Sequence, residues 1–307
     1  MKLLLGTHEW NIVEDGFQPE RNRIVESITS LGNGYMGMRG NFEEQYSGDS
    51  LQGTYIAGVY YPDRTVVGWW KVGYPEYFAK VLNAVNYIGI DVSIDQRPLD
   101  LHLWKPEEFR RTLDMQKGEL SRQFSLVDSE GRKFSVHARR FVSKEHRELA
   151  AISYSITLEQ DPTQSGSTIT FVPYLDGNVV NEDANYGEDF WLGVTESSEA
   201  DLQLVTMKTK KSSFVVAAAS SFRVCRNGEE LDNLEGLYTS SRRFAKAEVT
   251  LTLGVGDTLT LEKIVAVTTN RDFPSEQVSE QAVAILQRHQ MKSYAELFHG
   301  HARAWAD

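Results

Sequence analysis

The sequence has very little cysteine and no long apolar run. Cys225 is the only cysteine among 307 residues, so a disulfide within the chain is excluded, and its strand-like surroundings predict a buried, inert thiol. No stretch approaches the roughly 18 apolar residues that a membrane-spanning helix requires. Polar residues follow closely after Leu3–Leu5, which makes this run too short for a secretory signal peptide. These absences favour a cytoplasmic protein.

Basic residues are scarce relative to acidic ones. The chain has 43 Asp and Glu against 32 Lys and Arg, a formal net charge of −11, and its pI is about 5.2. Nucleic acid and anionic membranes are bound through basic patches, so we expect neither as a partner. The hydrophobic content of 41% is enough for the core of one large all-β domain or of two smaller domains.

The common catalytic motifs are missing. There is no G-x-S-x-G, no P-loop lysine, no H-E-x-x-H and no cluster of cysteine and histidine. A carboxylate can act as a general acid or base only in a shaped, partly desolvated pocket, and most acids are exposed. We therefore assign no catalytic residue. The acids that could pair in space are Glu43, Glu44, Asp91, Asp95, Asp176 and Asp183.

The most distinctive stretch, residues 26–44, has glycine at positions 32, 34, 37 and 40. Clustered glycine indicates positive φ angles or close approach of another backbone. The first three glycines spell the G-x-G-x-x-G of dinucleotide sites, but that fingerprint must open a helix. Gly40 and Asn41 would disrupt its first turn. We expect instead a tight crossing of backbone segments that also borders a domain interface.

Five side chains are candidates for substrate binding or for a domain interface: Asn33, Tyr35, Arg39, Trp69 and Trp70. Tyr35 and Arg39 flank the glycines and could reach a ligand hydroxyl; the alternative is packing and a salt bridge at the base of the loop. Trp69 and Trp70 are adjacent, so in a strand they would face opposite sides and core burial would explain at most one of them.

A second polar stretch, residues 176–191, is rich in acids and asparagine. Oxygen ligands suit calcium, but the spacing does not match an EF-hand loop. We expect a solvated loop and no metal site.

A period of two dominates residues 53–270. Ile88, Ile90, Val92 and Ile94 share one face, which is typical of a strand with one buried side. Asp128–Gly131 separates two alternating runs and predicts a hairpin, and residues 95–98 predict a turn into a short strand at Leu99–Leu103. Further strands are predicted at 54–60, 149–158, 167–175, 200–208, 213–224, 245–253 and 257–269.

No helical period interrupts these strands, which excludes a doubly wound α/β fold. The sequence thus predicts a mainly β fold, a large antiparallel β-sandwich over residues 1–272. From 273 to 307 the pattern becomes helical, with Ser275 as the expected N-cap. One apolar stripe must be buried on the sandwich or on a further domain: Leu297, Phe298, His301 and Trp305. His299 and His301 point to different faces, so they predict no metal pair.

Together these motifs resemble glycoside hydrolase family 65. Its opening signature is matched by Glu26-Ser27, Leu31-Gly32-Asn33-Gly34-Tyr35-Met36-Gly37-Met38-Arg39-Gly40-Asn41-Phe42 and Glu43-Glu44. Later stretches fit the same pattern: 110–115 with 118–122, 140–143 and 175–181. The resemblance implies a galactose-mutarotase-like super-sandwich at the N-terminus, a linker helix at 273–307, and then an (α/α)₆ catalytic barrel that lies beyond this chain.

The family includes maltose, trehalose and kojibiose phosphorylases. The resemblance implies that a glutamic acid of the barrel protonates the glycosidic oxygen while inorganic phosphate attacks with inversion, giving β-glucose 1-phosphate and a free sugar. It implies no cofactor, with phosphate as co-substrate. The expected partners are the protein's own barrel, a disaccharide and a second copy in a homodimer. No residue here matches the catalytic acid.

Two alternatives stay open at this point. The tryptophan and tyrosine content is compatible with a stand-alone carbohydrate-binding β-sandwich module. A mutarotase-like epimerase is the other alternative, and it would need a pair of histidine and glutamate as acid and base.

Overall fold

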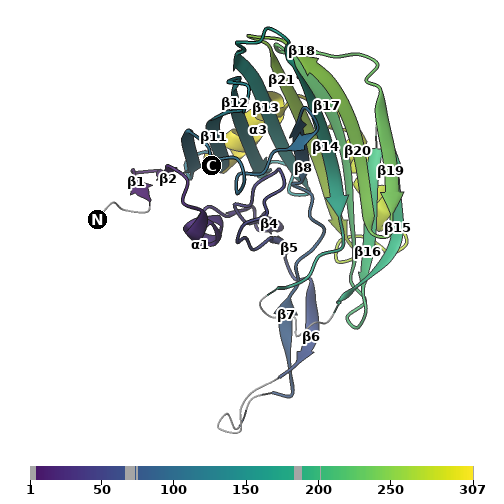
Figure 1. The fold of residues 1–307 in the computed structure, drawn as a ribbon. Helices are drawn as coiled ribbons and strands as arrows, with labels where there is room; N and C mark the ends of the chain where they lie inside the picture. Colours follow the sequence, from purple (N-terminus) through teal and green to yellow (C-terminus); the bar gives the residue numbers. More distant parts are fainter. Residues whose placement is uncertain (1–4, 66–72, 74, 183–188, 201, 307) are drawn as a thin grey trace.

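Two antiparallel sheets form the body of the protein. The computed structural model describes residues 5–65, 73, 75–182, 189–200 and 202–306. The larger sheet has eleven strands and the smaller one has five. In Figure 1 the sheets lie as curved layers, and the N-terminal elements α1, β4 and β5 pack beside them. The β-sandwich predicted from the sequence is confirmed.

The larger sheet has the order β1-β2-β10-β11-β12-β13-β21-β17-β16-β15, with β18 paired to β17. Its strands are β1 (Gly6–Thr7), β2 (Asn11–Asp15), β10 (Glu108–Asp114), β11 (Glu119–Val127), β12 (Lys133–Val142), β13 (Leu149–Gln160), β15 (Trp191–Glu199), β16 (Leu202–Thr209), β17 (Val215–Arg226), β18 (Glu229–Glu230) and β21 (Thr258–Thr269). The smaller sheet has the order β19-β20-β14-β8-β9. Its strands are β8 (Ile90–Ile94), β9 (Arg97–Pro98), β14 (Ser167–Asp176), β19 (Gly236–Ser241) and β20 (Phe244–Leu253).

The remaining elements are short. A three-stranded sheet joins β3 (Leu31–Gly32), β4 (Met36–Met38) and β5 (Thr54–Ile56), and a hairpin joins β6 (Tyr60–Arg64) and β7 (Tyr77–Val81). Figure 1 shows this hairpin projecting away from the body. The helices are the 3₁₀ turn η1 (Pro19–Arg21), α1 (Asn22–Ile28), α2 (Val278–Gln287) and α3 (Tyr294–Ala306). None of the described helices is long and apolar enough to cross a membrane.

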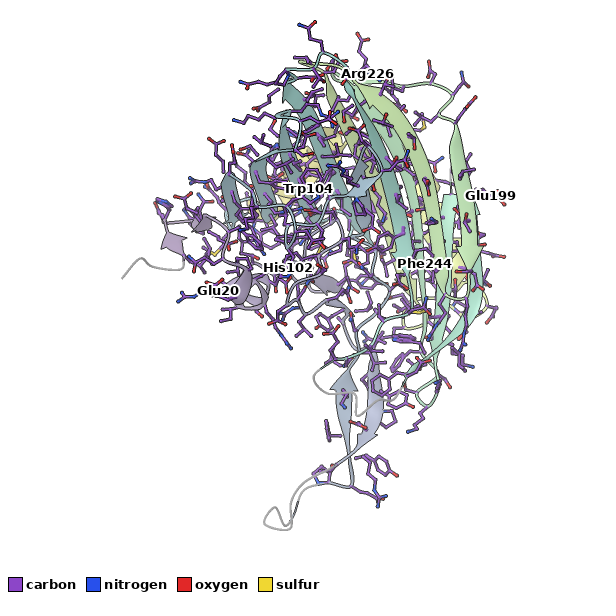
Figure 2. All side chains as sticks on the ribbon, in the orientation of Figure 1. Glu20, His102, Trp104, Glu199, Arg226 and Phe244 are labelled. Atoms are coloured by element: carbon purple, nitrogen blue, oxygen red, sulfur yellow. The ribbon has the colours of Figure 1, made fainter. Side chains whose placement is uncertain are left out.

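The inner faces of the two sheets form the main core. Every second residue of β14 is buried, from Ser167 to Leu175. Phe171 of β14, Val92 of β8 and Phe134 of β12 are at most 2% exposed. Burying one such side chain contributes roughly 1.5–3 kcal/mol. Figure 2 shows how densely side chains fill the space around both sheets. The alternation that predicted the strands therefore also holds the layers together.

A second core lies on the outer face of the larger sheet. Small side chains there, such as Ala217 and Ala266, let two helices approach closely. Helix α2 buries Val278, Ala282 and Leu286, which lie four residues apart on one face. The apolar face of α2 is thus buried on the sandwich.

Contacts of α3 with the sheet extend along its whole length. Leu297 and Phe298 join the second core, His301 is fully buried, and the indole of Trp305 donates to the carbonyl of Met115 (2.9 Å).

The C-terminal helical region differs from the prediction of one helix capped by Ser275. It forms two helices, and the first begins at Val278 with Gln277 as N-cap. The hydroxyl of Ser275 instead accepts a hydrogen bond from the side-chain amide of Asn270 (3.1 Å). Ser275 lies three residues before the first residue of α2, which is too early in the chain to cap this helix.

The short strand predicted at Leu99–Leu103 is also wrong. Asp100 forms a turn there: its carboxylate accepts from the amide of His102 (2.9 Å), and its carbonyl accepts from Leu103 and Trp104. Local side-chain bonds of this kind compete with strand pairing. Pairing with β8 is made by Arg97–Pro98.

Most other predicted strands are confirmed. The hairpin around Asp128–Gly131 joins β11 and β12, and the strands from 149 to 269 have ends within two residues of the prediction. The strand predicted at 54–60 ends at Ile56, because the chain turns at Gly58 with φ of +73°. Cys225 lies in β17 as expected, but it is half-buried and not buried.

Candidate functional site

The glycine-rich stretch forms a small hairpin. Strands β3 and β4 pair with Gly32 opposite Gly37, and Gly34 in the turn has φ of +89°, which favours glycine. A Cβ atom on Gly37 would lie 3.2 Å from the carbonyl oxygen of Leu31. The three glycines of the G-x-G-x-x-G pattern therefore serve a hairpin and do not open a helix.

The fourth glycine lies at a crossing of two backbones. The amide of Gly40 donates to the carbonyl of Glu26 in α1 (2.8 Å). A Cβ atom on Gly40 would lie 2.0 Å from the hydroxyl oxygen of Thr29. The tight crossing predicted from the sequence is present here.

Asn33 connects the hairpin to a loop more than a hundred residues away. Its side-chain oxygen accepts from the amides of Tyr35 (3.0 Å) and Met36 (2.9 Å). Its side-chain nitrogen donates to the carbonyls of Ser143 (2.7 Å) and Arg147 (2.9 Å). Both the oxygen and the nitrogen of the Asn33 side chain therefore form hydrogen bonds that hold the backbone in place.

Tyr35 is buried beside the same loop. Its ring lies 5.0 Å from the guanidinium carbon of Arg147, and its hydroxyl faces the side chains of Thr269 and Asp272. Burial raises the pKa of this hydroxyl, and the carboxylate of Asp272 raises it further. Tyr35 is thus a neutral packing residue of the hairpin.

Arg39 ties the chain after the hairpin to α1. Its Nε donates to the carbonyl of Leu51 (2.8 Å), and one terminal nitrogen donates to the hydroxyl of Ser27 (2.6 Å) and the carbonyl of Arg23 (3.1 Å). These bonds replace the salt bridge that the sequence suggested for the loop base. Trp69 and Trp70 lie outside the described residues.

Residues 143–148, which we term the junction loop, join the hairpin to both C-terminal helices. The amide of Lys144 donates to Nδ1 of His301 in α3 (3.0 Å). The ring of His146 lies 4.3 Å from that of His289, just after α2. Arg147 pairs with Asp272 at 3.0 Å. The junction loop therefore links the glycine hairpin to the two C-terminal helices through direct contacts.

Beneath the hairpin lies a fully buried ionic network. Arg122 of β11 pairs with Glu43 (2.7 Å) and with Glu44, and Arg140 of β12 pairs with Glu43. Burial alone would raise the pKa of Glu43, but Arg140 and Arg122 together lower it below its usual value. These two acids, which the sequence left as candidates for pairing with other acids, are held by arginine instead.

Arg111 of β10 forms the second half of this network. It pairs with Glu14 (3.0 Å) and donates to the carbonyl of Gly40 (3.0 Å) and the side chain of Asn22 (2.8 Å). Sequence reasoning missed all three arginines. A signal was present: Arg111 lies between Phe109 and Leu113 on the apolar face of its strand, and a charge at such a position needs a buried partner.

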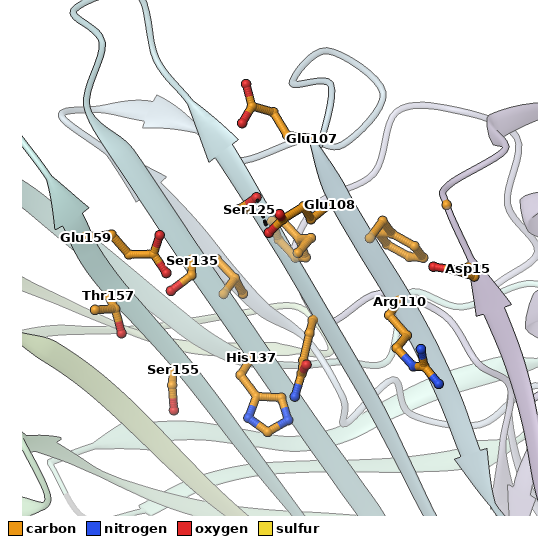
Figure 3. A pocket seen from close by; sticks show the side chains of 15 residues that line it. Asp15, Glu107, Glu108, Arg110, Ser125, Ser135, His137, Ser155, Thr157 and Glu159 are labelled. Atoms are coloured by element: carbon orange, nitrogen blue, oxygen red, sulfur yellow. Dashed lines mark hydrogen bonds between the residues drawn. The ribbon is translucent and has the colours of Figure 1, made fainter.

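A polar trough of about 560 Å³ lies on the outer face of the larger sheet, across β10 to β13. Ser135 and His137 line it and share their face of β12 with Phe141, which is covered by α3. Figure 3 shows Arg110, His137 and Glu159 standing on different strands of this surface. Burial, with a smaller effect of Arg139, lowers the pKa of His137 to about 4.

Two of the glutamates that line the trough are bonded to residues other than His137. Glu159 pairs with Lys133 (3.5 Å), and Glu108 accepts from Ser125 (3.2 Å). Neither glutamate forms an ion pair with His137 among the described residues.

Part of the acidic stretch that the sequence predicts to be a solvated loop, residues 183–188, lies outside the described part of the chain. Among the described residues, no group of three or more His, Cys, Asp or Glu is arranged to hold a metal ion.

Comparison with known proteins gives consistent results. The model for the glycosyl hydrolase family 65, N-terminal domain, matches residues 12–307. Maltose phosphorylase of Bacillus subtilis (strain 168) is 40% identical over 99% of this chain and 39% of the relative. Alpha,alpha-trehalose phosphorylase of Thermoanaerobacter brockii is 31% identical over 86% of this chain and 35% of the relative.

A solved structure, described as a candidate kojibiose phosphorylase from the human microbiome, superposes with a TM-score of 0.84 and 25% identity. The superposition covers 98% of this chain and 38% of that one. The chain thus spans about two fifths of the length of these relatives. Since the family model matches almost all of its residues, this chain belongs to glycosyl hydrolase family 65 and contains the N-terminal domain of that family.

Proposed function

We propose that this chain is the non-catalytic N-terminal domain of an inverting disaccharide phosphorylase of the maltose phosphorylase type. Phosphate and an α-glucosyl disaccharide would give β-glucose 1-phosphate and a free sugar, without a cofactor. The observation that carries the proposal is the 40% identity to a maltose phosphorylase over 99% of the chain. The catalytic acid would lie in a barrel beyond α3, in a cytoplasmic protein.

The proposed role of the domain is to position that barrel. Helix α3 is fixed at both ends: the hydroxyl of Tyr294 donates to Glu119 (2.8 Å), and Trp305 donates to Met115. A helix held in this way sets where the following chain begins. The junction loop would couple that helix to Asn33 and Tyr35, which supports their proposed place next to the domain interface.

The β6–β7 hairpin is the second proposed contact with the barrel. Its exposed large side chains are Tyr60 (42%), Tyr77 (52%), Phe78 (44%) and Val81 (58%). Clustered exposed apolar groups mark interaction surfaces. About three fifths of the length of the maltose phosphorylase lies outside the matched part, and we propose the barrel as the occupant. Trp69 and Trp70, which lie outside the described residues, stay candidates for a domain interface on the sequence alone.

The test compares two proteins: the 307-residue chain and a longer protein that continues from it. With maltose and phosphate, we expect β-glucose 1-phosphate from the longer protein and none from the chain alone. Trehalose and kojibiose serve as competing substrates. Phosphate-independent release of glucose by the longer protein, or activity of the chain alone, would overturn the proposal. Polarimetry on the chain alone tests the mutarotase alternative, for which we expect no acceleration.

A further inference from the structure

Histidine side chains hold the junction loop to both segments of the C-terminal helical region. His301 of α3 meets the loop at Lys144, and His289, just after α2, meets it at His146. In Figure 1 α3 (yellow) lies against the outer face of β11 to β13. None of these histidines lines the trough of Figure 3, and the proposed phosphorolysis does not use them.

The hydrogen bonds of His301 fix its neutral form. Its side chain is fully buried, and its ring stacks on Phe141 with centroids 4.7 Å apart. Because Nδ1 accepts from the amide of Lys144 (3.0 Å), the proton lies on Nε2, which is 3.3 Å from the carbonyl oxygen of Gly118. A second proton would have to bind Nδ1, where it would face the N–H group of Lys144. The charged form of His301 therefore requires that the bond between the loop and α3 break.

The surroundings of His301 are closely packed. Gly118 has φ of +64°, and a Cβ atom on it would lie 2.9 Å from Nε2 of His301. A Cβ atom on Gly300 would clash with the carboxylate of Glu145 in the junction loop. Glu145 in turn pairs with Arg303 of α3 (3.2 Å). The turn between β10 and β11, helix α3 and the loop are thus in direct contact here, and a second proton on the ring is accommodated only if they separate.

A pair of histidines links the loop to the end of α2. The rings of His146 and His289 lie with centroids 4.3 Å apart, and the buried Nδ1 of His289 has no hydrogen-bond partner among the described residues. Arg288 and Lys292 oppose a positive charge on His289, whereas Glu145 favours it. Protonation of both rings would bring two positive charges into contact, and it would leave the proton on Nδ1 of His289 without an acceptor.

Other charged side chains near these contacts have partners of their own. On the sheet, Glu119 accepts from the hydroxyl of Tyr294 (2.8 Å), and the guanidinium carbon of Arg139 lies 4.8 Å from the centre of the same ring. In the loop, Arg147 pairs with Asp272 (3.0 Å). None of these four charged groups is among the main causes of the lowered pKa values of the two helical histidines.

Both contacts weaken in the same range of pH. Burial lowers the pKa of His301, although the backbone groups of Gly118 and Lys117 oppose this. Burial, together with the positive groups around it, lowers the pKa of His289 to about 4. Histidine in an unfolded segment titrates near pH 6.5, so the opened loop binds protons that the closed loop does not. Closure is therefore complete above about pH 6.5 and is lost as the pH falls toward 4.

We propose that the junction loop is a pH-sensitive switch: protonation of His301 and of the pair His146 and His289 detaches the loop from α3 and from the end of α2, while the sandwich stays folded. The main core between the sheets is formed by apolar side chains, so acid opens the junction before the core. The switch is a property of this chain and goes beyond the proposed phosphorolysis. In a longer protein it would make the position of the chain after α3 depend on pH.

The test is hydrogen exchange with mass spectrometry on the 307-residue chain at pH 7 and pH 5, corrected for the intrinsic pH dependence of amide exchange. We expect the opening equilibrium of residues 143–148 and 288–306 to rise roughly tenfold or more at pH 5, with the strands of the main core unchanged, because each such histidine contributes up to about a factor of ten per pH unit. His301→Gln and His289→Phe remove the protonation sites, and the second keeps an aromatic contact with His146. Each should reduce the rise by about threefold or more.

His137→Gln is the matched control. His137 also has a lowered pKa, of about 4, but it lines the trough and has no hydrogen bond or ring contact with the junction among the described residues, so the rise should persist. Equal protection of the junction at both pH values overturns the proposal, and so does an equal rise in the core strands or a rise that both junction variants retain. If circular dichroism shows that His301→Gln does not fold, His289→Phe, at a half-buried position, decides alone.

Discussion

Three arginines at core-facing positions of the larger sheet each meet a buried carboxylate. Arg111 meets Glu14, and Arg122 and Arg140 meet Glu43. Such pairs add little to stability compared with apolar residues, but breaking one leaves an uncompensated buried charge. The main effect of the network is therefore to fix the position of residues 40–44 on the sheet. Its contribution to the free energy of folding is small by comparison.

The first prediction concerns Arg122→Met. Glu44 would lose its arginine partner, and Glu43 would keep only Arg140, in a site where Arg122 and Glu44 are at most 4% exposed, so we expect a loss of about 3–5 kcal/mol in the free energy of unfolding. Urea unfolding at pH 7 measures it. The matched control is Arg226→Met, because its pair with Asp257 is about one third exposed and should be worth less than about 1 kcal/mol. Equal small losses would contradict the prediction.

The second prediction concerns Lys263, which is fully buried. Burial lowers its pKa to about 7, and Asp91 opposes this only in part. Between about pH 7 and 10 the unfolded chain binds a proton that the folded chain does not, so this lysine makes stability rise with pH. The stability gained in this way is complete above the pKa that lysine has in the unfolded chain, and it is lost as the pH falls through 7. Between these pH values the free energy of unfolding changes by up to about 1.4 kcal/mol per pH unit.

Lys263→Met should remove that slope, and urea unfolding at pH 7, 8 and 9 measures it as a difference from the unchanged chain. Lys208→Met, at an exposed position of β16, is the control and should leave the slope as it was. Identical slopes in all three proteins would show that Lys263 is protonated in the folded state.

Whole elements could be predicted from the sequence where one face of a strand is buried and the other is not. Strand β14 has this pattern along its whole length, β13 and β21 have it over about half of theirs, and all three were found. Strands β7 and β15 were missed because most of their residues are exposed on both faces, so no period of two exists to be read. Strand β10 also alternates between buried and less buried residues but was not predicted, so alternation of burial was not sufficient by itself.

The C-terminal helical region is divided into α2 and α3, and the sequence contains a sign of this division that the pattern of apolar residues does not show. Ser293 and Glu296 form a capping box at the start of α3: the amide of Ser293 donates to Glu296 (2.7 Å), and its hydroxyl accepts from the amide of Glu296 (3.1 Å). The spacing S-x-x-E is visible in the sequence. The contacts of Asn33 with the junction loop, by contrast, span more than a hundred residues and left no local trace.

The third prediction concerns the connection between the hairpin and the junction loop. Asn33→Ala removes the bonds to the carbonyls of Ser143 and Arg147, so we expect faster amide exchange in residues 31–38 and 143–148. The strands of the main core should exchange as before. Hydrogen exchange with mass spectrometry measures both regions. Asn178→Ala, which removes a contact with Arg242 far along the sequence, is the control; equal exchange at the junction loop in both variants would refute the coupling.

On the scale of the whole molecule, this chain combines a sandwich with a complete core and a hairpin that leaves apolar side chains exposed. Tyr77 and Val81 of β7 are more than half exposed, whereas Leu297 and Phe298 of α3 pack in the second core of the sandwich. Exposed apolar side chains of this kind mark interaction surfaces, which leads to the last prediction.

Tyr77→Ser with Phe78→Ser should change the chain alone and the longer protein differently. In the 307-residue chain both side chains are already exposed, so we expect the midpoint of thermal unfolding to change little, since substitutions at such sites usually stay within about 0.5 kcal/mol. In the longer protein the same change would remove contacts with the barrel, lower the unfolding midpoint by several degrees and reduce kcat/KM for phosphorolysis of maltose. Leu237→Ser, at an exposed position of β19, is the matched control. If the double variant and the control behaved alike in the longer protein, the hairpin would not be a contact with the barrel.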